Sequence, residues 1–184
     1  MAYLGVEELA ALGFKHLGKN VLISDKAAIY DPSEISIGDF SRIDDFCVIS
    51  GKVNVGKYVH ITPTCLVAGG REGIILEDYA TLAYGVRVFS QSDDYSGATM
   101  VNSLIPTKYK DEYYAKVTIK KHVIIGAGST IFPGVVIEEG CAIGAMTLVT
   151  SSTSSWGIYA GIPAKRIKER KKDMLELEKQ FNLE

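Results

Sequence analysis

Aliphatic residues recur at every sixth position in two separate blocks of this chain. The first block consists of Ile37, Ile43, Ile49, Val55, Ile61 and Val67, and the second of Ile119, Ile125, Ile131, Ile137, Ile143 and Val149. An amphipathic helix has a period of 3.6 and a half-buried strand a period of 2, so neither produces this spacing. A strict short repeat is typical of a solenoid. Each six-residue unit then forms one short strand and one turn, and its aliphatic side chain points at the axis.

A second rank of residues, many of them small, lies two positions before each aliphatic. Ser41, Cys47, Ser129 and Cys141 are examples. Small side chains fit where the chain bends toward a corner, and glycine or a Pro-Gly pair supplies the corner conformations. The pattern therefore predicts an all-β solenoid, a parallel β-helix, from about residue 21 to residue 160.

The six-residue phase is interrupted twice. It slips by three around residues 69–73, which read Gly-Gly-Arg-Glu-Gly, and it resumes at Leu76. Residues 89–116 carry no repeat and are rich in Asp, Ser and Tyr. A loop of that length inside a compact domain is usually functional. We expect a small corner insertion at the first break and one long extruded loop at the second.

Both ends of the chain read as helical. Residues 1–20 are expected to form a short helical segment, and residues 164–183 a terminal helix that lies against the side or the end of the solenoid. Ile167, Met174, Leu177 and Phe181 give the terminal helix its apolar stripe. The whole chain, 1–184, is of ordinary size for a single domain.

Composition limits the possible partners. The net charge is −2 and the isoelectric point is near 6.0, so the chain has no general positive field for nucleic acid or an anionic membrane. No apolar run reaches the length of a membrane span, and the N-terminus lacks the features of a signal peptide. Cys47, Cys65 and Cys141 all occupy second-rank positions, which indicates small core residues of a reducing compartment. We expect a cytoplasmic protein that binds neither nucleic acid nor membrane.

Three segments carry a family resemblance. They are residues 123–134 (Val-Ile-Ile-Gly-Ala-Gly-Ser-Thr-Ile-Phe-Pro-Gly), residues 143–150, and residues 160–165 (Ala-Gly-Ile-Pro-Ala-Lys). They resemble the hexapeptide-repeat acyltransferases, and among these most closely the galactoside, maltose and surface-polysaccharide sugar acetyltransferases. The resemblance implies a left-handed coil, acetyl-CoA as the acyl donor, no metal, and a homotrimer with its active sites in the grooves between subunits.

The resemblance also assigns residues to the cofactor. Lys165 and Lys168 match positions that bind phosphate, Ala127, Ala145 and Thr150 match positions along the pantetheine arm, and Ser151 stands where a lysine is common. Independently, six cations crowd the expected start of the terminal helix, where the helix dipole disfavours positive charge. An anionic ligand would explain this cluster, which contains Lys165, Arg166, Lys168, Arg170, Lys171 and Lys172.

The acceptor side departs from the family pattern. The sugar O-acetyltransferases use a loop histidine as general base, but residues 89–116 contain no histidine, and Asp93 falls at the matching place. A solvated aspartate is a poor base for a hydroxyl, whereas an amine is already nucleophilic once neutral. The sequence therefore favours an amino sugar as the acceptor. Together with this argument, the resemblance implies an N-acetyltransferase for a nucleotide-linked, perosamine-like amino-deoxy sugar of O-antigen or other surface polysaccharide. Asp93 and Asp94 are expected to bind the acceptor and to serve as candidate proton acceptors, and Tyr84 and Tyr95 to stack on a sugar or nucleotide ring.

Other functions remain open at this stage. An O-acetyltransferase would need another base, for which His60 and His122 are the candidates, although His122 reads as a surface residue on a turn. A zinc hydro-lyase of the γ-carbonic-anhydrase type would need three converging histidines, but the solenoid carries only these two. A non-catalytic scaffold would leave both the cation cluster and the long loop without a purpose.

Overall fold

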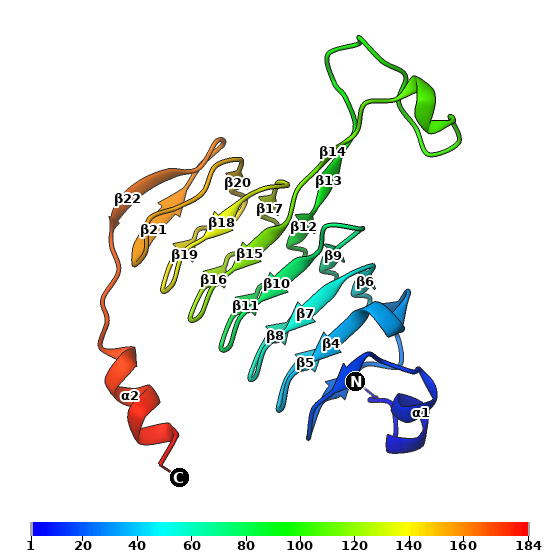
Figure 1. Cartoon of the computed structure of the whole chain (residues 1–184). Coiled ribbons are helices and arrows are strands. Elements are labelled where there is room, and N and C mark those ends of the chain that lie inside the picture. Colours follow the sequence, from blue (N-terminus) through cyan, green and yellow to red (C-terminus); the bar gives the residue numbers. More distant parts are fainter. Residues whose placement is uncertain (1, 184) are drawn as a thin grey trace.

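The computed structural model describes residues 2–183 and forms a parallel β-solenoid (Figure 1). Three parallel sheets of six, eight and six strands run along its length, apart from one antiparallel strand at the C-terminal end of the second sheet. Successive strands of one sheet come from successive coils, which confirms the solenoid that the six-residue repeat predicts. The predicted domain, 1–184, includes Met1 and Glu184, which lie outside the described residues.

The strands are short and evenly distributed among the sheets. The first sheet contains β1 (His16–Leu17), β4 (Ile35–Ile37), β7 (Val53–Val55), β10 (Ile74–Leu76), β15 (Val117–Ile119) and β18 (Val136–Ile137). The second contains β2 (Leu22–Ile23), β5 (Arg42–Ile43), β8 (His60–Ile61), β11 (Thr81–Leu82), β16 (Ile124–Ile125), β19 (Ala142–Ile143), β21 (Gly157–Ala160) and β22 (Lys165–Glu169). The third contains β3 (Ala28–Ile29), β6 (Val48–Ser50), β9 (Leu66–Ala68), β12 (Arg87–Phe89), β17 (Thr130–Ile131) and β20 (Leu148–Val149).

The register of these sheets explains both breaks in the repeat. Eighteen residues separate Ile35 from its partner Val53, which is one regular coil. Twenty-one residues separate Val53 from Ile74, so the slip of three is absorbed at the corner formed by residues 69–73. Ile74 then pairs with Val117 across the extruded loop without any shift in the coil. Insertions therefore leave the stacked interior intact.

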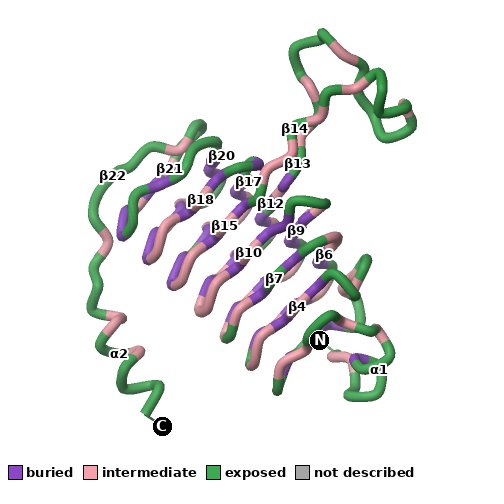
Figure 2. The backbone as a smooth tube through the Cα atoms, viewed as in Figure 1, coloured by how far each residue is buried: buried purple, intermediate pink, exposed green. Residues whose placement is uncertain are grey.

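The repeated aliphatic positions form the core. Ile43, Ile61, Leu82 and Ile125 are partners on neighbouring strands of the second sheet, and each is fully buried. Figure 2 shows such buried residues recurring along every coil. Each inward side chain packs on its equivalents in the coils above and below, so hydrophobic burial along the axis stabilises the whole stack.

The second-rank residues satisfy buried carbonyl groups. Ser41 Oγ donates to the carbonyl oxygen of Gly56 at 2.7 Å, and Ser129 Oγ donates to that of Gly144 at 2.9 Å. Cys47 Sγ donates to the Thr62 carbonyl oxygen at 3.1 Å. All three cysteines are free and buried, as expected for core positions. A small side chain with one donor is therefore suited to this rank for a chemical reason as well as a steric one.

The chain termini depart from the prediction. Helix α1 spans only Val6–Ala11, and β1 already begins at His16. The helix predicted over 164–183 is wrong in its first half, because residues 165–169 form strand β22, which is antiparallel to β21. Strand β21 ends the parallel stack with an open edge, and pairing with β22 satisfies its backbone groups. Helix α2 follows at Met174–Phe181.

Helix α2 lies along one corner of the solenoid, as expected of a helix against its side. That corner carries a ladder of stacked rings, from Phe40 through Tyr58 and Tyr79 to His122, with centroids 4.9 to 5.4 Å apart. Phe181 meets Tyr58 edge-on, and His122 Nε2 lies 2.8 Å from the Glu178 carboxylate. His122 is thus buried beneath the helix, which corrects its interpretation as a surface residue.

None of the helices within residues 2–183 combines the length and the apolar character that crossing a membrane requires.

Neighbouring residues of β16 provide a direct test of the core. Ile125 is fully buried, whereas Ile124 points outward and is 41% exposed. We expect Ile125→Ala to lower the free energy of unfolding by about 2 to 5 kcal/mol, because the cavity persists inside a stacked interior. Ile124→Ala, the matched control, should cost less than about 1 kcal/mol. Urea denaturation of both variants checks the difference, and equal losses would contradict the assignment of inward and outward faces.

Candidate active site

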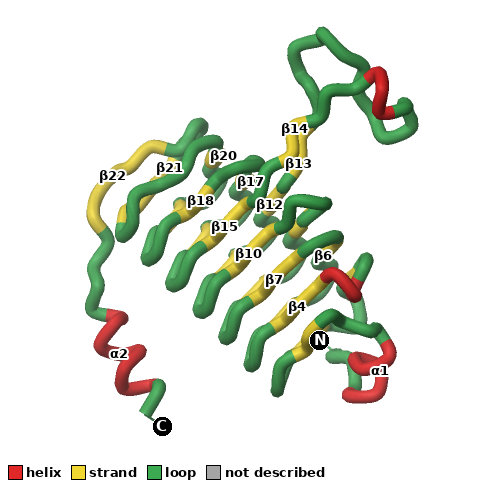
Figure 3. The backbone as a smooth tube through the Cα atoms, viewed as in Figure 1, coloured by secondary structure: helices red, strands yellow, loops and turns green. Residues whose placement is uncertain are grey.

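The extruded loop leaves the solenoid on a two-stranded stem. β13 (Gln91–Ser92) pairs antiparallel with β14 (Tyr113–Tyr114), and Figure 3 shows the intervening segment projecting well beyond the coils. Ser90 fixes the stem to the solenoid, because its hydroxyl donates to the Gly69 carbonyl oxygen and its carbonyl accepts the Ala115 amide. The long loop is therefore confirmed, although its base is ordered β structure.

Two hollows flank the base of this loop, and we call them the loop-base pockets. One has a volume of about 360 Å³ and lies against Phe132 of the solenoid. The other, of about 490 Å³, extends toward Arg71. Asp93, Tyr95 and Glu112 line both pockets, so Asp93 stands at the centre of the polar surface at the loop base.

The structure distinguishes the two adjacent aspartates. The carboxylate of Asp94 accepts hydrogen bonds from the Ser96 amide at 2.8 Å and from the Thr99 amide and hydroxyl at 3.1 and 2.9 Å. These bonds, led by those from Ser96, lower the pKa of Asp94 to about 2. Asp94 therefore organises the loop and is a very weak base. The exposed carboxylate of Asp93 forms no hydrogen bond within residues 2–183, so Asp93 is the better candidate for an acceptor-binding group.

The loop-base pockets are rich in acidic groups. Glu112 carries a hydrogen bond from Tyr114 and an ion pair with Lys110 at 3.2 Å, and these two contacts lower the pKa of Glu112. The Arg71 guanidinium lies 3.6 Å from the centre of the Tyr114 ring. With Asp93 and Glu112 both ionised, the surface favours a cation such as a protonated amine over an anion.

The two predicted aromatic residues, Tyr84 and Tyr95, lie in different parts of the structure. Tyr95 is 90% exposed and lines both loop-base pockets. Tyr84 is also exposed, but it lies on a corner of the solenoid, where its carbonyl oxygen accepts the Gly128 amide at 2.8 Å. Tyr84 does not line the loop-base pockets, so the structure does not bring the two rings together in one chain.

The residues expected along the pantetheine arm lie at two different corners. Ala127 and Ala145 follow β16 and β19, and the Met146 amide donates to the Ala127 carbonyl oxygen across neighbouring coils at 2.8 Å. Thr150 and Ser151 follow β20 instead, at the corner between the third and first sheets. A single chain therefore does not assemble these four residues into one groove.

Part of the cation cluster serves the fold, which corrects its interpretation as a single ligand-binding group. Arg170 donates to the carbonyl oxygens of His122 and Gly140 at 2.8 and 3.0 Å, and burial lowers its pKa. Arg166 pairs with Glu169, and Lys172 lies 5.5 Å from the Trp156 ring centre. The expectation that these cations sit at the start of a helix, against its dipole, is also wrong, because the first residues of the cluster belong to strand β22.

Lys165 and Lys168 remain candidates for phosphate binding. In a regular strand, residues three apart point to opposite faces, but a bulge interrupts the pairing of β21 with β22. As a result Lys165 lies opposite Ala160 and Lys168 opposite Ile158, which are both outward positions of β21. Both lysines therefore share the outer face of the second sheet, and within residues 2–183 neither forms an ion pair.

His60 and His122 lie in different parts of the solenoid. His60 bonds Asp44 on the outer face of the second sheet, whereas His122 bonds Glu178 beneath α2. Among residues 2–183, no group of three or more His, Cys, Asp or Glu side chains is arranged to hold a metal ion. The geometry thus offers nothing specific for the zinc hydro-lyase hypothesis.

The chain is similar to known proteins in both sequence and structure. No family model matches the chain. The chain is 43% identical over 184 residues to the dTDP-4-amino-4,6-dideoxy-D-glucose acyltransferase of Escherichia coli, an alignment that covers 98% of this chain and 95% of that protein.

Solved structures of AntD, an N-acyltransferase from Bacillus cereus, are also similar. Its complex with dTDP and 3-hydroxybutyryl-CoA is 49% identical, covers 98% of this chain and 96% of that chain, and has a TM-score of 0.96. A serine-to-alanine variant of AntD, in complex with dTDP-4-amino-4,6-dideoxyglucose and coenzyme A, is 49% identical with a TM-score of 0.97 and covers 98% and 97% of the two chains.

The contrast between the two aspartates is testable. We expect Asp94→Asn to speed amide hydrogen exchange at Ser96 and Thr99, because the charged acceptor is lost. Asp93→Asn should leave both amides unchanged. The pKa of Asp94 is about 2 in the folded chain, below its ordinary value of 3.8, so its contribution to loop order is complete above about pH 4 and is lost as the pH falls through 2. A measured carboxyl titration near 4 would contradict this assignment.

Proposed function

The chain belongs to the hexapeptide-repeat sugar acyltransferases, and from that premise we propose that it is an acyl-CoA-dependent N-acyltransferase for a nucleotide-linked 4-amino-4,6-dideoxy sugar. The 43% identity with the E. coli enzyme of that substrate class, over nearly the full length of both chains, carries the proposal. The complexes of AntD with dTDP-linked ligands and coenzyme A support it. Acetyl-CoA is the expected donor, and the 3-hydroxybutyryl-CoA complex of AntD names a second acyl group to test.

The loop chemistry suits an amine acceptor. The acceptor nitrogen adds to the thioester carbonyl, the carbon–sulfur bond breaks, and coenzyme A leaves as the thiol once it gains a proton. The ionised carboxylates of Asp93 and Glu112 would attract a sugar that arrives as an ammonium ion. Tyr95, beside them, would contact the sugar or nucleotide ring. No loop histidine is needed to activate an amine, because a neutral amine is itself a nucleophile.

A homotrimer would complete the site. The split between Ala127 and Ala145 at one corner and Thr150 and Ser151 at another supports a groove shared by neighbouring subunits. Figure 3 shows the loop projecting beyond the coils, and in such a trimer it would cover the groove, with Asp93 at its base. The reaction needs acyl-CoA and a nucleotide sugar, so we place it in the cytoplasm, where it would supply surface polysaccharide such as O-antigen.

A thiol-release assay tests the substrate class. With acetyl-CoA or 3-hydroxybutyryl-CoA and matched amino and hydroxy forms of dTDP-4,6-dideoxyglucose, we expect release of coenzyme A with the amino sugar only. Turnover confined to the hydroxy sugar would overturn N-acylation and favour the O-acetyltransferase alternative. Absence of turnover with every sugar, despite binding of coenzyme A, would count against the substrate class.

The two lysines of β22 provide a separate test of the donor site. We expect the double variant Lys165→Ala/Lys168→Ala to raise the KM for acetyl-CoA by about 10- to 100-fold, because each lost hydrogen bond from an exposed lysine is worth about 0.7 to 1.4 kcal/mol. The KM for the amino sugar should not change. Lys19→Ala, an exposed lysine near the N-terminus, is the control. If the lysines recognise phosphate, the double variant should lose less affinity for dephospho-CoA than for coenzyme A. An equal loss of affinity for both ligands would contradict phosphate recognition.

A further inference from the structure

On the outer face of the seven parallel strands of the second sheet, ionisable side chains occur in only two adjacent coils. Its outward positions are partners in register: Leu22, Arg42, His60, Thr81, Ile124, Ala142 and Ile158. Arg42 and His60 are the only ionisable side chains among these seven residues. A row otherwise made of aliphatic residues and one threonine therefore concentrates its charge on β5 and β8.

The corner beside them contains an unexpected carboxylate. The residue that follows each strand of this sheet is small and uncharged in five coils, but in the coil of β5 it is Asp44. The equivalent residues are Ser24, Thr62, Ala83, Gly126 and Gly144. Asp44 is nevertheless 2% exposed. A buried carboxylate is costly unless it is paired and hydrogen-bonded, and the fold of this corner does not require one.

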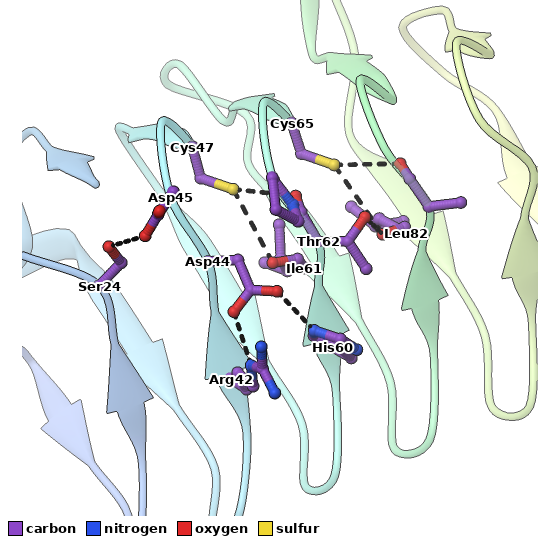
Figure 4. Close-up of polar contacts among 12 residues, drawn as sticks. Ser24, Arg42, Asp44, Asp45, Cys47, His60, Ile61, Thr62, Cys65 and Leu82 are labelled. Atoms are coloured by element: carbon purple, nitrogen blue, oxygen red, sulfur yellow. Dashed lines mark hydrogen bonds and ion pairs between the residues drawn. The ribbon is translucent and has the colours of Figure 1, made fainter. Parts of the chain in front are cut away.

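Asp44 uses its two oxygens to hold Arg42 and His60. Oδ1 accepts a hydrogen bond from Arg42 Nε at 2.6 Å, and Oδ2 lies 2.9 Å from His60 Nε2 (Figure 4). An ionised carboxylate only accepts hydrogen bonds, so Nε2 carries the proton and the neutral ring has its lone pair on Nδ1. The His60 side chain is 38% exposed, which leaves the imidazole accessible from solvent. The arrangement fixes the tautomer and the direction of a proton acceptor.

The position of His60 relates it to the donor site. From β22, which carries Lys165 and Lys168, the sheet order runs through β21, β19, β16 and β11 to β8. These five steps span about 24 Å at about 4.8 Å per strand. The diphosphate and extended pantetheine arm of acyl-CoA measure roughly 20 Å by ordinary bond lengths. The outward residues between the two ends are Ile158, Ala142, Ile124 and Thr81, none of them charged. A donor anchored by the lysines would thus bring its thioester to the coils of Thr81 and His60.

We propose that His60 is the proton acceptor of the acyl transfer, with Asp44 and Arg42 as its positioning residues. The inference rests on the proposed function, because it names the base of that same reaction. His60 Nδ1 takes a proton from the acceptor ammonium, and the neutral amine then adds to the thioester carbonyl. The carbon–sulfur bond breaks, the second nitrogen proton passes to the leaving sulfur, and His60 releases its proton to solvent.

The surroundings of His60 are consistent with this role. Its charged neighbours are Asp44 and Arg42, and the Tyr3 ring lies 5.6 Å from the Arg42 guanidinium carbon. On the β11 side the neighbour is the uncharged Thr81. His122 is covered by α2 and bonded to Glu178. His16 is exposed but belongs to the first sheet, so His60 is the accessible histidine on the outer face of the second sheet.

His60→Asn is the decisive variant. Asparagine retains a donor for Asp44, so the buried carboxylate stays paired, but it removes the titrating nitrogen. In the full-length protein with acetyl-CoA and the amino sugar, we expect kcat to fall about 100-fold or more, as for removal of a general base. The KM for acetyl-CoA should stay within about twofold. The rise of kcat with pH should lose one ionisation. His16→Asn, an exposed histidine of the first sheet, is the matched control and should behave as the wild type.

Asp44→Asn tests the positioning role. It should lower kcat on the wild-type background but have little further effect when added to His60→Asn, because its contribution acts through the imidazole. Thermal melts of each variant establish that the chain still folds. If His60→Asn keeps the wild-type kcat and pH profile, or changes only the KM for the sugar, the proposal is wrong while N-acylation stands. Wild-type failure to acylate any amino sugar would overturn both.

Discussion

Every coil of this solenoid must place aliphatic side chains on the axis in register with the coils on either side. Ile35, Val53, Ile74 and Val117 hold this register even though 18, 21 and 43 residues separate successive members. A one-residue error inside a coil would turn its buried side chains outward, so any extra length has to leave at a corner. The corner segment at residues 69–73 and the long loop both obey this rule. Polar side chains are therefore confined mainly to the outer faces and corners, where the candidate site residues lie.

This constraint also decides how much of the fold is readable from sequence. A solenoid core is local, since each inward position recurs six residues later, and the pattern alone identifies Ile119 to Val149 as stacked. The structure at the chain ends depends on contacts with residues that are distant in the sequence. Residues 165–169 read Lys-Arg-Ile-Lys-Glu, which suggests the start of a helix. A helix there would leave the backbone groups at the edge of β21 unpaired, whereas strand β22 pairs with them. The burial of His122 likewise depends on where α2 docks, which no pattern around His122 reveals.

The candidate site divides in the same way. Composition and resemblance select the loop aspartates, but only side-chain contacts show that Asp94 is occupied within its own loop while Asp93 faces the pockets. Lys165 and Lys168 share a face because of a bulge that spacing alone would not suggest. Tyr84 lies apart from the loop-base pockets of its own chain, because nearness in sequence to the loop does not place the ring there. The pairing of Arg42 with His60 carried a sequence signal, an interval of one eighteen-residue coil, which is informative only once the register is known.

Binding and reactivity of an amine make opposite demands on this site. Carboxylates at the loop base attract the ammonium form of the acceptor and stabilise it, so the better they bind the sugar, the smaller the fraction of reactive neutral amine. Asp94 cannot relieve the conflict, because a carboxylate with a pKa of about 2 takes no proton near neutrality. A separate proton acceptor resolves it. His60, held by the buried Asp44 carboxylate and 38% exposed, is matched to that task because an imidazole can both accept and release a proton. The loop-base pockets lie beside the third sheet and the Asp44–His60 pair lies on the second, so the two would complement each other where neighbouring subunits of the proposed trimer meet, with one supplying affinity and the other nucleophilicity.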